Sequence, residues 1–399
     1  MTERIHVAVV LEGVTTLAGV LHVETGRTFS STFVYDADFL ADRSAYALDP
    51  ALPLSSGPHH APGLPRAFAD AAPDRWGRNL IRRRLVREGL NRTLTDLDFL
   101  LGVSDLTRQG ALRFSRDRGG PYVSEHADVP PLLAMPRLAR AADHVARNEG
   151  TLTDVKALLD AGSGSLGGAR PKASVVDDQG VLHIAKFAHP QDDWDVLGWE
   201  ATALDLAEQA DIRVPLRRLI RFGGGAALVL ARFDRAPRGR VGYLSAMSLL
   251  QGSDGDSLDY LDLAEAMALV SASPAADLRE LWTRILFGTV IGNTDDHLRN
   301  HGFLRAPGGW RLSPAFDINP NPESSLHQTS IGGARTVEES IVMLRESAGD
   351  FGLSAARVAD ISETVKTATQ RWRTVAASHG IRDGEINLMA AAIRPEVLG

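Results

Sequence analysis

Polar side chains that could do chemistry crowd into one short stretch, residues 292–304, which reads GNTDDHLRNHGFL. Asp295, Asp296 and His297 are adjacent, and Asn300 follows within one helical turn. Burial of ionisable groups costs solvation free energy, so such a density is expensive to place in a core. The stretch therefore predicts a functional loop.

The separation of Asp295 and Asn300 matches the Asp-x-x-x-x-Asn spacing of a kinase catalytic loop. In that loop the aspartate accepts the proton of the substrate hydroxyl and the asparagine holds Mg²⁺. Asp317 lies in LSPAFDINP, after a predicted strand–turn–strand in GFLRAPGGWRLS, and would be a further metal ligand. Oxygen ligands and a base suit Mg²⁺-dependent phosphoryl transfer. Each aspartate alone could equally be a turn or N-cap residue.

A glycine-rich segment, GSGSLGGARPK (162–172), precedes these residues in the chain. Its glycines would let backbone N–H groups approach a phosphate closely. The segment matches neither a Walker A motif nor GxGxxG, so on its own it could be a surface loop without a ligand.

Lys186 lies in VLHIAKF, whose alternation predicts a strand with Leu182, Ile184 and Lys186 on one face. The lysine could bind phosphate or reach solvent at a sheet edge. The sequence HIAK has the shape of the kinase V-A-I-K strand. Glu200, expected to begin a helix over 200–210, would hold the lysine, or would simply be a first-turn glutamate favoured by the helix dipole.

The elements expected to position these residues change in type along the chain. Residues 5–35 predict three strands, 57–65 a loop, 73–90 a basic helix ending at Gly89, and 136–150 a helix ending at Gly150. Strands dominate again from 172 to 235, and helices dominate after about 260. This order predicts three domains with boundaries at 1–145, 146–258 and 259–399.

Composition limits the class of protein. The 399 residues favour two or three domains, and the net charge of −7 argues against nucleic-acid binding by the whole chain. Because the chain has no cysteine, disulfides and zinc–thiolate sites are excluded and a reducing compartment is favoured. No apolar run approaches the roughly 20 residues of a membrane span, so a cytoplasmic protein is expected.

Taken together, the motifs resemble the HipA family of serine/threonine kinases, toxins of bacterial type II toxin–antitoxin pairs. The resemblance lies in SLGGARPKA (165–173), HIAKF (183–187), ARFDR (231–235), and GNTDDHLRN followed by LSPAFDI. FLLGVSDLTRQGALRF (99–114) resembles the family's N-terminal subdomain. GNT replaces the HRD triplet and FDI replaces DFG, which excludes a eukaryotic-type kinase.

The resemblance implies an α+β, protein-kinase-like two-lobed fold, with a β-rich N-terminal subdomain and a helical C-terminal lobe. It also implies roles for single residues. Asp295 would be the general base, Asn300 and Asp317 the Mg²⁺ ligands, Lys186 the ATP-phosphate contact and Glu200 its partner. Asp296 would face solvent or cap a turn. The implied nucleotide contacts also include Ser165, Gly167, Gly168, Ala169, Lys172, Arg232, Phe233, Asp234 and His297.

Some of these roles keep alternatives. Phe233 would lie near adenine, while Asp234 would reach ribose or brace the hinge. His297 would position the loop or be a hydrogen-bonded structural histidine. Autophosphorylation of Ser165, with Ser163 as the alternate acceptor, would silence the kinase by placing phosphate charge where ATP phosphates sit.

The implied function is an ATP- and Mg²⁺-dependent kinase toxin acting on a translation protein, for which the resemblance suggests an aminoacyl-tRNA synthetase. A HipB-like DNA-binding antitoxin would neutralise it and supply most of the DNA contact. A catalytically silent nucleotide-binding co-repressor acting through the antitoxin is the alternative. A metal-dependent hydrolase built on Asp295, Asp296 and His297 is a third.

Overall fold

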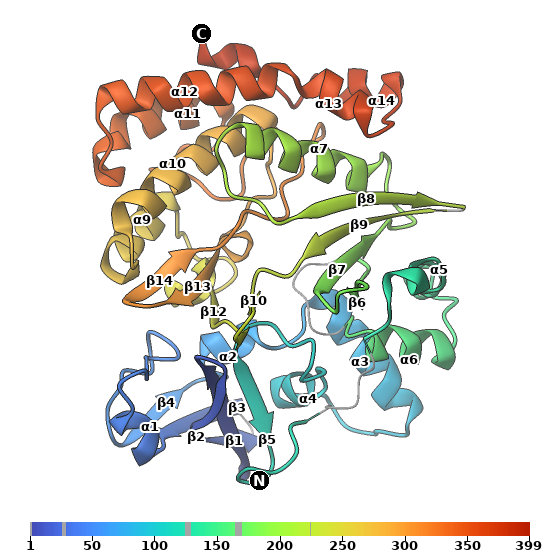
Figure 1. Ribbon diagram of the computed structural model, residues 1–399, viewed down its shortest axis with the longest axis vertical. Helices are drawn as coiled ribbons and strands as arrows, with labels where there is room; N and C mark the ends of the chain where they lie inside the picture. The colour runs from blue at the N-terminus through green and yellow to red at the C-terminus, as the bar shows by residue number, and fades with distance from the viewer. Residues whose placement is uncertain (1, 26–28, 124–128, 164–169, 224) are drawn as a thin grey trace. The chain divides into compact units, whose positions relative to one another are not determined.

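The computed structural model describes residues 2–25, 29–123, 129–163, 170–223 and 225–399. They form two units (Figure 1). Unit 1 comprises Met1–Gln191 and Ile220–Leu244, and unit 2 comprises Asp192–Leu219 and Ser245–Gly399. No helix among the described residues is long and apolar enough to cross a membrane.

Both units contain helices and strands. Those of unit 1 are β1 Thr2–Leu11, β2 Val14–Thr25, β3 Phe29–Tyr35, α1 Ala37–Ala41, β4 Pro58–Ala61, α2 Arg66–Asp70, α3 Arg75–Arg87, α4 Asp96–Leu101, β5 Leu112–Ser115, η1 Leu132–Ala134, α5 Met135–Ala146, α6 Leu152–Asp160, β6 Lys172–Val176, β7 Leu182–Phe187, β9 Gly225–Ala231, β10 Arg235–Ala236 and β11 Gly239–Arg240. Strands β8 Arg217–Phe222 and β12 Tyr243–Ser245 have residues in both units. Those of unit 2 are α7 Val196–Gln209, α8 Ala246–Leu249, α9 Tyr260–Val270, α10 Pro274–Ile291, η2 Leu298–Asn300, β13 Gly302–Ala306, β14 Gly309–Leu312, α11 Val337–Glu346, η3 Ser347–Phe351, α12 Ala355–Gln370, α13 Trp372–Ser378, α14 Asp383–Met389 and η4 Pro395–Leu398.

The first sheet of unit 1 is antiparallel, in the order β4-β3-β2-β1-β5. The expected strands over residues 5–35 are present as β1, β2 and β3. Apolar residues at alternate positions of β1, including Ile5, Val7 and Val9, are fully buried. The expected loop over 57–65 is wrong in part, since β4 pairs with β3 there. Pro58 is tolerated because β4 is an edge strand.

The second sheet has the order β6-β7-β9-β8. One face, including Ala173, Ala185 and Phe187, packs against apolar residues of α3, α4, α5 and α6 such as Leu80 and Leu138. This core joins residues 76–161 to the sheet, so the chain does not divide at residue 145 as expected. The physical reason is that the helices before residue 146 bury the same sheet face as the helix that follows.

Helix ends follow their capping residues. Asp74 accepts a hydrogen bond from the Gly77 N–H at the start of α3, and Gly89 has a φ of 92° just after its end, as expected. Helix α5 ends at Ala146, earlier than Gly150 predicts, because Asn148 adopts the left-handed conformation with a φ of 64°.

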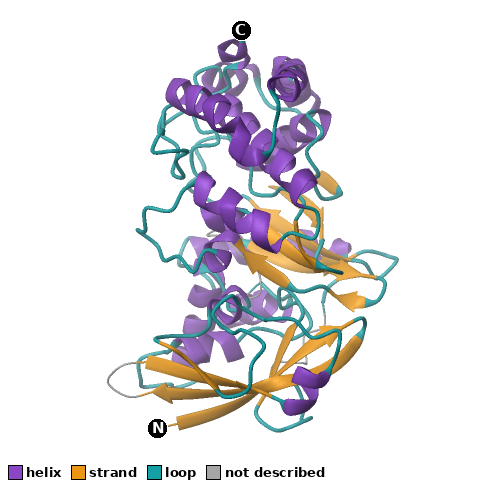
Figure 2. Cartoon of the chain, turned by 90° about the vertical axis from the view of Figure 1, so that its left-hand side faces the viewer, coloured by secondary structure: helices purple, strands orange, loops and turns teal. Residues whose placement is uncertain are grey.

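Unit 2 is mostly helical, as Figure 2 shows in purple. Its central helix, α10, has a buried Trp282 whose Nε1 donates to the Leu344 carbonyl at 2.9 Å. Pro274 begins α10 and Gly292, with a φ of 70°, ends it. The chain then enters the stretch with which the sequence analysis began.

Candidate active site

Two loops of unit 2 are joined by hydrogen bonds. The backbone N–H of Asn319 donates to Oδ1 of Asn293 at 3.1 Å, and Nδ2 of Asn321 donates to Oγ1 of Thr294 at 3.0 Å. These bonds hold the loop that carries Asp317 against the loop that carries Asp295. The predicted strand–turn–strand between them is present as β13 and β14.

Asn300 and the neighbours of Asp317 face the same small space. A narrow pocket is lined by residues that include Asn300, Phe316 and Ile318. Asn300 donates Nδ2 to the Asp295 carbonyl at 3.4 Å, and its N–H donates to the His297 carbonyl at 2.7 Å. Asn300 thus shares a pocket with the two neighbours of Asp317, and the roles of Asn300 and Asp317 as metal ligands stay predictions.

Asp317 has an unusual backbone. Its φ of 59° lies in the left-handed region, which non-glycine residues seldom adopt. Strained residues of this kind persist where the surrounding structure over-determines them, and they concentrate at active sites. The half-buried side chain of Asp317 therefore occupies a conformation typical of a functional residue.

The oxygen atoms of these loops fit a hard divalent cation. Asn300 contributes an amide, and Oδ1 of the nearby Asn319 is buried and accepts no hydrogen bond from the described residues. Asp317 contributes a carboxylate. Carboxylate and amide oxygens are the ligands that Mg²⁺ takes, together with water and substrate phosphates.

The adjacent aspartates have opposite environments. Asp295 is exposed. Asp296 is buried, so the expectation that it faces solvent or caps a turn is wrong. Its carboxylate accepts a hydrogen bond from the Tyr260 hydroxyl at 2.5 Å and lies 3.2 Å from Nε2 of His301.

Burial acts on the pKa of both partners in this contact. Burial raises the pKa of Asp296, but His301 and the Tyr260 hydroxyl outweigh it and hold the pKa below its ordinary value. Burial and the Asp296 charge raise the pKa of Tyr260 well above its ordinary value. Tyr260 therefore remains a hydroxyl donor and Asp296 a carboxylate acceptor.

His297 is half-buried, and its Nδ1 atom is buried with no hydrogen-bond partner among the described residues. Its role as a positioning residue stays a prediction. The hydrolase alternative gains nothing from the geometry, because the Asp296 carboxylate is engaged by Tyr260 and His301. Across the described ranges, no group of three His, Cys, Asp or Glu side chains is arranged to hold a metal.

The two lysines of the predicted phosphate site lie on one face of the second sheet in unit 1. Lys186 is buried on β7 and lies directly opposite Lys172 on β6. Leu182 and Ile184 share that face, and Ala185 and Phe187 pack on the other, as predicted. Nζ of Lys172 pairs with Oδ2 of Asp74 at 2.9 Å.

Glu200 does not begin its helix. Helix α7 starts at Val196, and Glu200 is buried in its second turn, so the interpretation as a first-turn glutamate is wrong. The start lies earlier because the Asp195 side chain caps the helix through the Gly198 N–H at 3.0 Å. Glu200 belongs to unit 2 and Lys186 to unit 1, and their pairing stays a prediction.

Most of the predicted phosphate loop lies outside the described residues, including Ser165, Gly167, Gly168 and Ala169. Ser163 is described and is fully buried. Its Oγ has no hydrogen-bond partner among the described residues. Phosphorylation of Ser163 would therefore require this segment to open.

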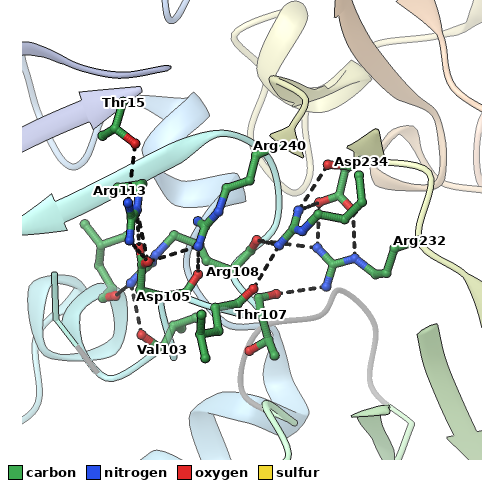
Figure 3. Close-up of polar contacts among 12 residues, drawn as sticks. Thr15, Val103, Asp105, Thr107, Arg108, Arg113, Arg232, Asp234 and Arg240 are labelled. Carbon is green, nitrogen blue, oxygen red and sulfur yellow. Dashed lines mark hydrogen bonds and ion pairs between the residues drawn. The ribbon is translucent and has the colours of Figure 1, made fainter. Parts of the chain in front are cut away.

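The predicted hinge residues enter a network of ion pairs within unit 1 (Figure 3). Asp234 is buried and lies 2.5 Å from Arg232 and 2.9 Å from Arg235, and it accepts from the Gly110 N–H at 2.8 Å. Burial raises the pKa of Asp234, but the two arginines outweigh it and hold the pKa well below its ordinary range. Both roles expected of Asp234, contact with ribose and bracing of the hinge, stay predictions.

The network continues into the N-terminal part of unit 1. Arg232 also donates to the Thr107 carbonyl at 2.8 Å, and the buried Asp105 pairs with Arg113 at 2.5 Å and Arg240 at 3.0 Å. Phe233, between the paired residues, is half-buried. The nucleotide contacts of Arg232, Phe233 and Asp234 stay predictions.

Sequence reasoning missed Tyr260, His301, Asn293 and Asn319. Asn293 and His301 lie within two residues of the Asp295–Asn300 segment in the sequence, and this closeness could have identified them. Tyr260 lies 36 residues before Asp296 at the start of α9, and no local pattern connects the two.

Comparison with known proteins covers most of the chain. A family model for the HipA-like C-terminal domain matches residues 164–372, and one for the HipA N-terminal domain matches residues 7–115. The chain also resembles the solved structure of the HipA, HipB and operator DNA complex of the Shewanella oneidensis MR-1 toxin–antitoxin system. That likeness has a TM-score of 0.71 at 16% identity and covers 99% of this chain and 95% of the other. It confirms the expected fold class.

Two curated relatives carry names of candidate kinases. Kinase Y4dM of Sinorhizobium fredii is 32% identical over 101 residues, which are 24% of each chain. A kinase of Haemophilus influenzae is 27% identical over 143 residues, which are 31% of this chain and 42% of the relative. The matches thus span less than half the length of either relative.

Proposed function

Because this chain belongs to the HipA family, we propose that it is an ATP- and Mg²⁺-dependent protein kinase acting on serine or threonine. The observation that carries the proposal is the junction of the two loops in unit 2 through Asn293 and Asn319. This junction holds the loop of Asn300 and of the exposed Asp295 against the loop of Asp317, which supports the proposal. The names of the two relatives support a kinase.

In this proposal each residue of the site has a separate chemical role. The substrate hydroxyl oxygen forms the new bond to the γ-phosphorus, its proton passes to Asp295, and ADP leaves. Asn300 and Asp317 hold Mg²⁺, and Lys186 binds the ATP phosphates. Bound Mg²⁺ supplies charge neutralisation for the transferred phosphoryl group. Rate enhancement would come mainly from this positioning and from electrostatics.

The proposed biological setting is that of a toxin–antitoxin pair. A HipB-like antitoxin would bind the kinase and provide the contact with operator DNA, by analogy with the Shewanella complex, which contains HipA, HipB and operator DNA. The net charge of −7 agrees with indirect DNA contact. The proposed substrate is a translation protein of the aminoacyl-tRNA synthetase class, and the proposed location is the cytoplasm.

The first test is intact-mass spectrometry after incubation with ATP and Mg²⁺, with Asp295→Asn as the matched variant. We expect the wild-type chain to gain one phosphate, on Ser165 or Ser163, and the variant to gain none. If the wild-type chain transfers phosphate neither to its own phosphate loop nor to an added aminoacyl-tRNA synthetase, the catalytically silent co-repressor becomes the better interpretation. Antitoxin binding retained by Asp295→Asn would show that the variant is folded.

A further inference from the structure

The candidate catalytic loop rests on a buried carboxylate that no part of the proposed transfer uses. Asp296 is 8% exposed, Tyr260 5% and His301 4%. The Tyr260 hydroxyl donates to Asp296 Oδ2 at 2.5 Å, and Nε2 of His301 lies 3.2 Å from the same carboxylate. The Tyr260 and His301 rings also meet edge to face, with centroids 5.6 Å apart.

A carboxylate at this position is costly to bury. A loop needs only turn-forming residues, and an apolar or amide side chain would carry a smaller desolvation cost than a charge. The cost is offset because both partners are fixed by other bonds. The Tyr260 N–H donates to the Ser330 carbonyl at 3.0 Å, and the His301 carbonyl accepts from the Ala246 N–H at 2.7 Å.

The backbone around Asp295 is anchored on both sides. The Thr294 carbonyl accepts from the Gln328 N–H at 2.8 Å, and the Asp296 carbonyl accepts from Thr329 Oγ1 at 2.6 Å. Asp295 therefore stands between two fixed residues, and its side chain is exposed while that of Asp296 points inward.

The same contact reaches Asn300 from the other end of the loop. His301 follows Asn300 directly, and both residues line the narrow pocket with Asp296. A bond between Asp296 and His301 thus ties together the two ends of the segment that carries the candidate base and the candidate metal ligand. The loop is closed by side chains as well as by its backbone.

We propose that Tyr260, Asp296 and His301 form a buried positioning cluster that sets the directions of Asp295 and Asn300. The inference rests on the proposed function, because positioning has meaning only if these two residues act. None of the three cluster residues contacts the reacting atoms. Their contribution would come from holding the loop within the narrow tolerance that catalysis demands.

The decisive variant is Tyr260→Phe, which removes one hydroxyl and keeps the ring. Tyr35→Phe is its matched control, since Tyr35 is also buried and its hydroxyl donates to the Leu52 carbonyl at 2.7 Å, in the first sheet of unit 1. We expect Tyr260→Phe to lower kcat by about tenfold to a hundredfold with KM for ATP within about twofold. Tyr35→Phe should leave both unchanged.

Two further readouts separate positioning from general loss of structure. Hydrogen exchange of the nucleotide-free protein should quicken at the amides of residues 293–300 in Tyr260→Phe and not in Tyr35→Phe. The double variant Tyr260→Phe/Asp296→Ala should lose no more kcat than Asp296→Ala alone, because Asp296→Ala already removes the acceptor of the Tyr260 hydroxyl. If Asp296→Ala does not fold, the kinetic and hydrogen-exchange measurements on Tyr260→Phe still decide the question.

The outcomes are distinguishable from failure of the proposed function. If the wild type transfers phosphate, Asp295→Asn does not, and Tyr260→Phe keeps wild-type kcat and exchange, the cluster is overturned while the kinase stands. If the folded wild type transfers no phosphate to itself or to a protein substrate, the proposed function is overturned and the cluster with it.

Discussion

Lys172 and Lys186 lie directly opposite each other on the antiparallel strands β6 and β7, and Asp74 pairs with Lys172 at 2.9 Å. Side chains paired in this way are close enough for like charges to repel. Asp74, which caps the N-terminus of α3, offsets the charge of Lys172. The pairing predicts that Lys172 contributes to stability, in addition to its proposed role in binding phosphate.

Lys172→Met should therefore lower the free energy of unfolding by about 3 kcal/mol, since it leaves the carboxylate of Asp74 without its buried cation. Urea unfolding of the single variants and of Asp74→Asn/Lys172→Met measures the effect. The double variant should lose less than the sum of the two singles. A Lys172→Met protein as stable as the wild type would contradict the expectation.

Asp317→Asn should lower phosphate transfer by about a hundredfold while changing the free energy of unfolding by less than about 1 kcal/mol. Asparagine tolerates the left-handed backbone of residue 317 but lacks the charge that a cation requires. Asp317→Ala should lose the same activity and, in addition, about 1 kcal/mol of stability to backbone strain. Transfer assays and thermal unfolding give the comparison, and wild-type transfer by Asp317→Asn would remove this residue from the site.

Gly292→Ala should destabilise the protein by about 2 to 3 kcal/mol, because the residue has a φ of 70° and an added Cβ would lie 2.8 Å from the Ala392 carbonyl oxygen. Gly308→Ala is the matched variant, with a φ of 84° and no atom within 4 Å of an added Cβ. It should cost only about 1 kcal/mol. Equal losses in denaturant unfolding would mean that the contact with Ala392 is unimportant.

Stability should depend on pH through Asp234. Its pKa in the folded chain lies below the unfolded value of about 3.9, so its contribution is present above that pH and is lost as the pH falls below it. The stability difference between wild type and Asp234→Asn should be largest near pH 7 and shrink below about pH 4. Asp254→Asn, at an exposed ion pair with Arg299, is the matched variant and should change the free energy of unfolding at pH 7 by less than about 1 kcal/mol. A difference independent of pH would contradict the assignment.

Much of the fold was predictable where the pattern is local. The alternation around Lys186 correctly assigned its face of β7, and the three strands over residues 5–35 and the helices after residue 260 were expected. The boundary near residue 145 was not predictable in this way. It depends on helices before and after that boundary burying one sheet face, which is a tertiary relation.

The site shows the same division between local and tertiary information. The spacing of Asp295 and Asn300 pointed to the loop. Asp296, however, was expected to face solvent or cap a turn, and it is buried. Its environment is created by Tyr260 from another helix, so the local pattern could not distinguish two adjacent aspartates. The left-handed backbone of Asp317 is likewise set by the loops around it.

Unit 1 is discontinuous in the chain, and this has a consequence for synthesis on the ribosome. Strand β9 pairs with β7, yet helix α7 of unit 2 is made between them. The second sheet cannot close until β9 has emerged, so one edge of β7 stays unpaired during translation of α7. A chain released before residue 225 would expose that edge and would be a target for chaperones and proteases. Such a truncated chain would be removed as misfolded protein.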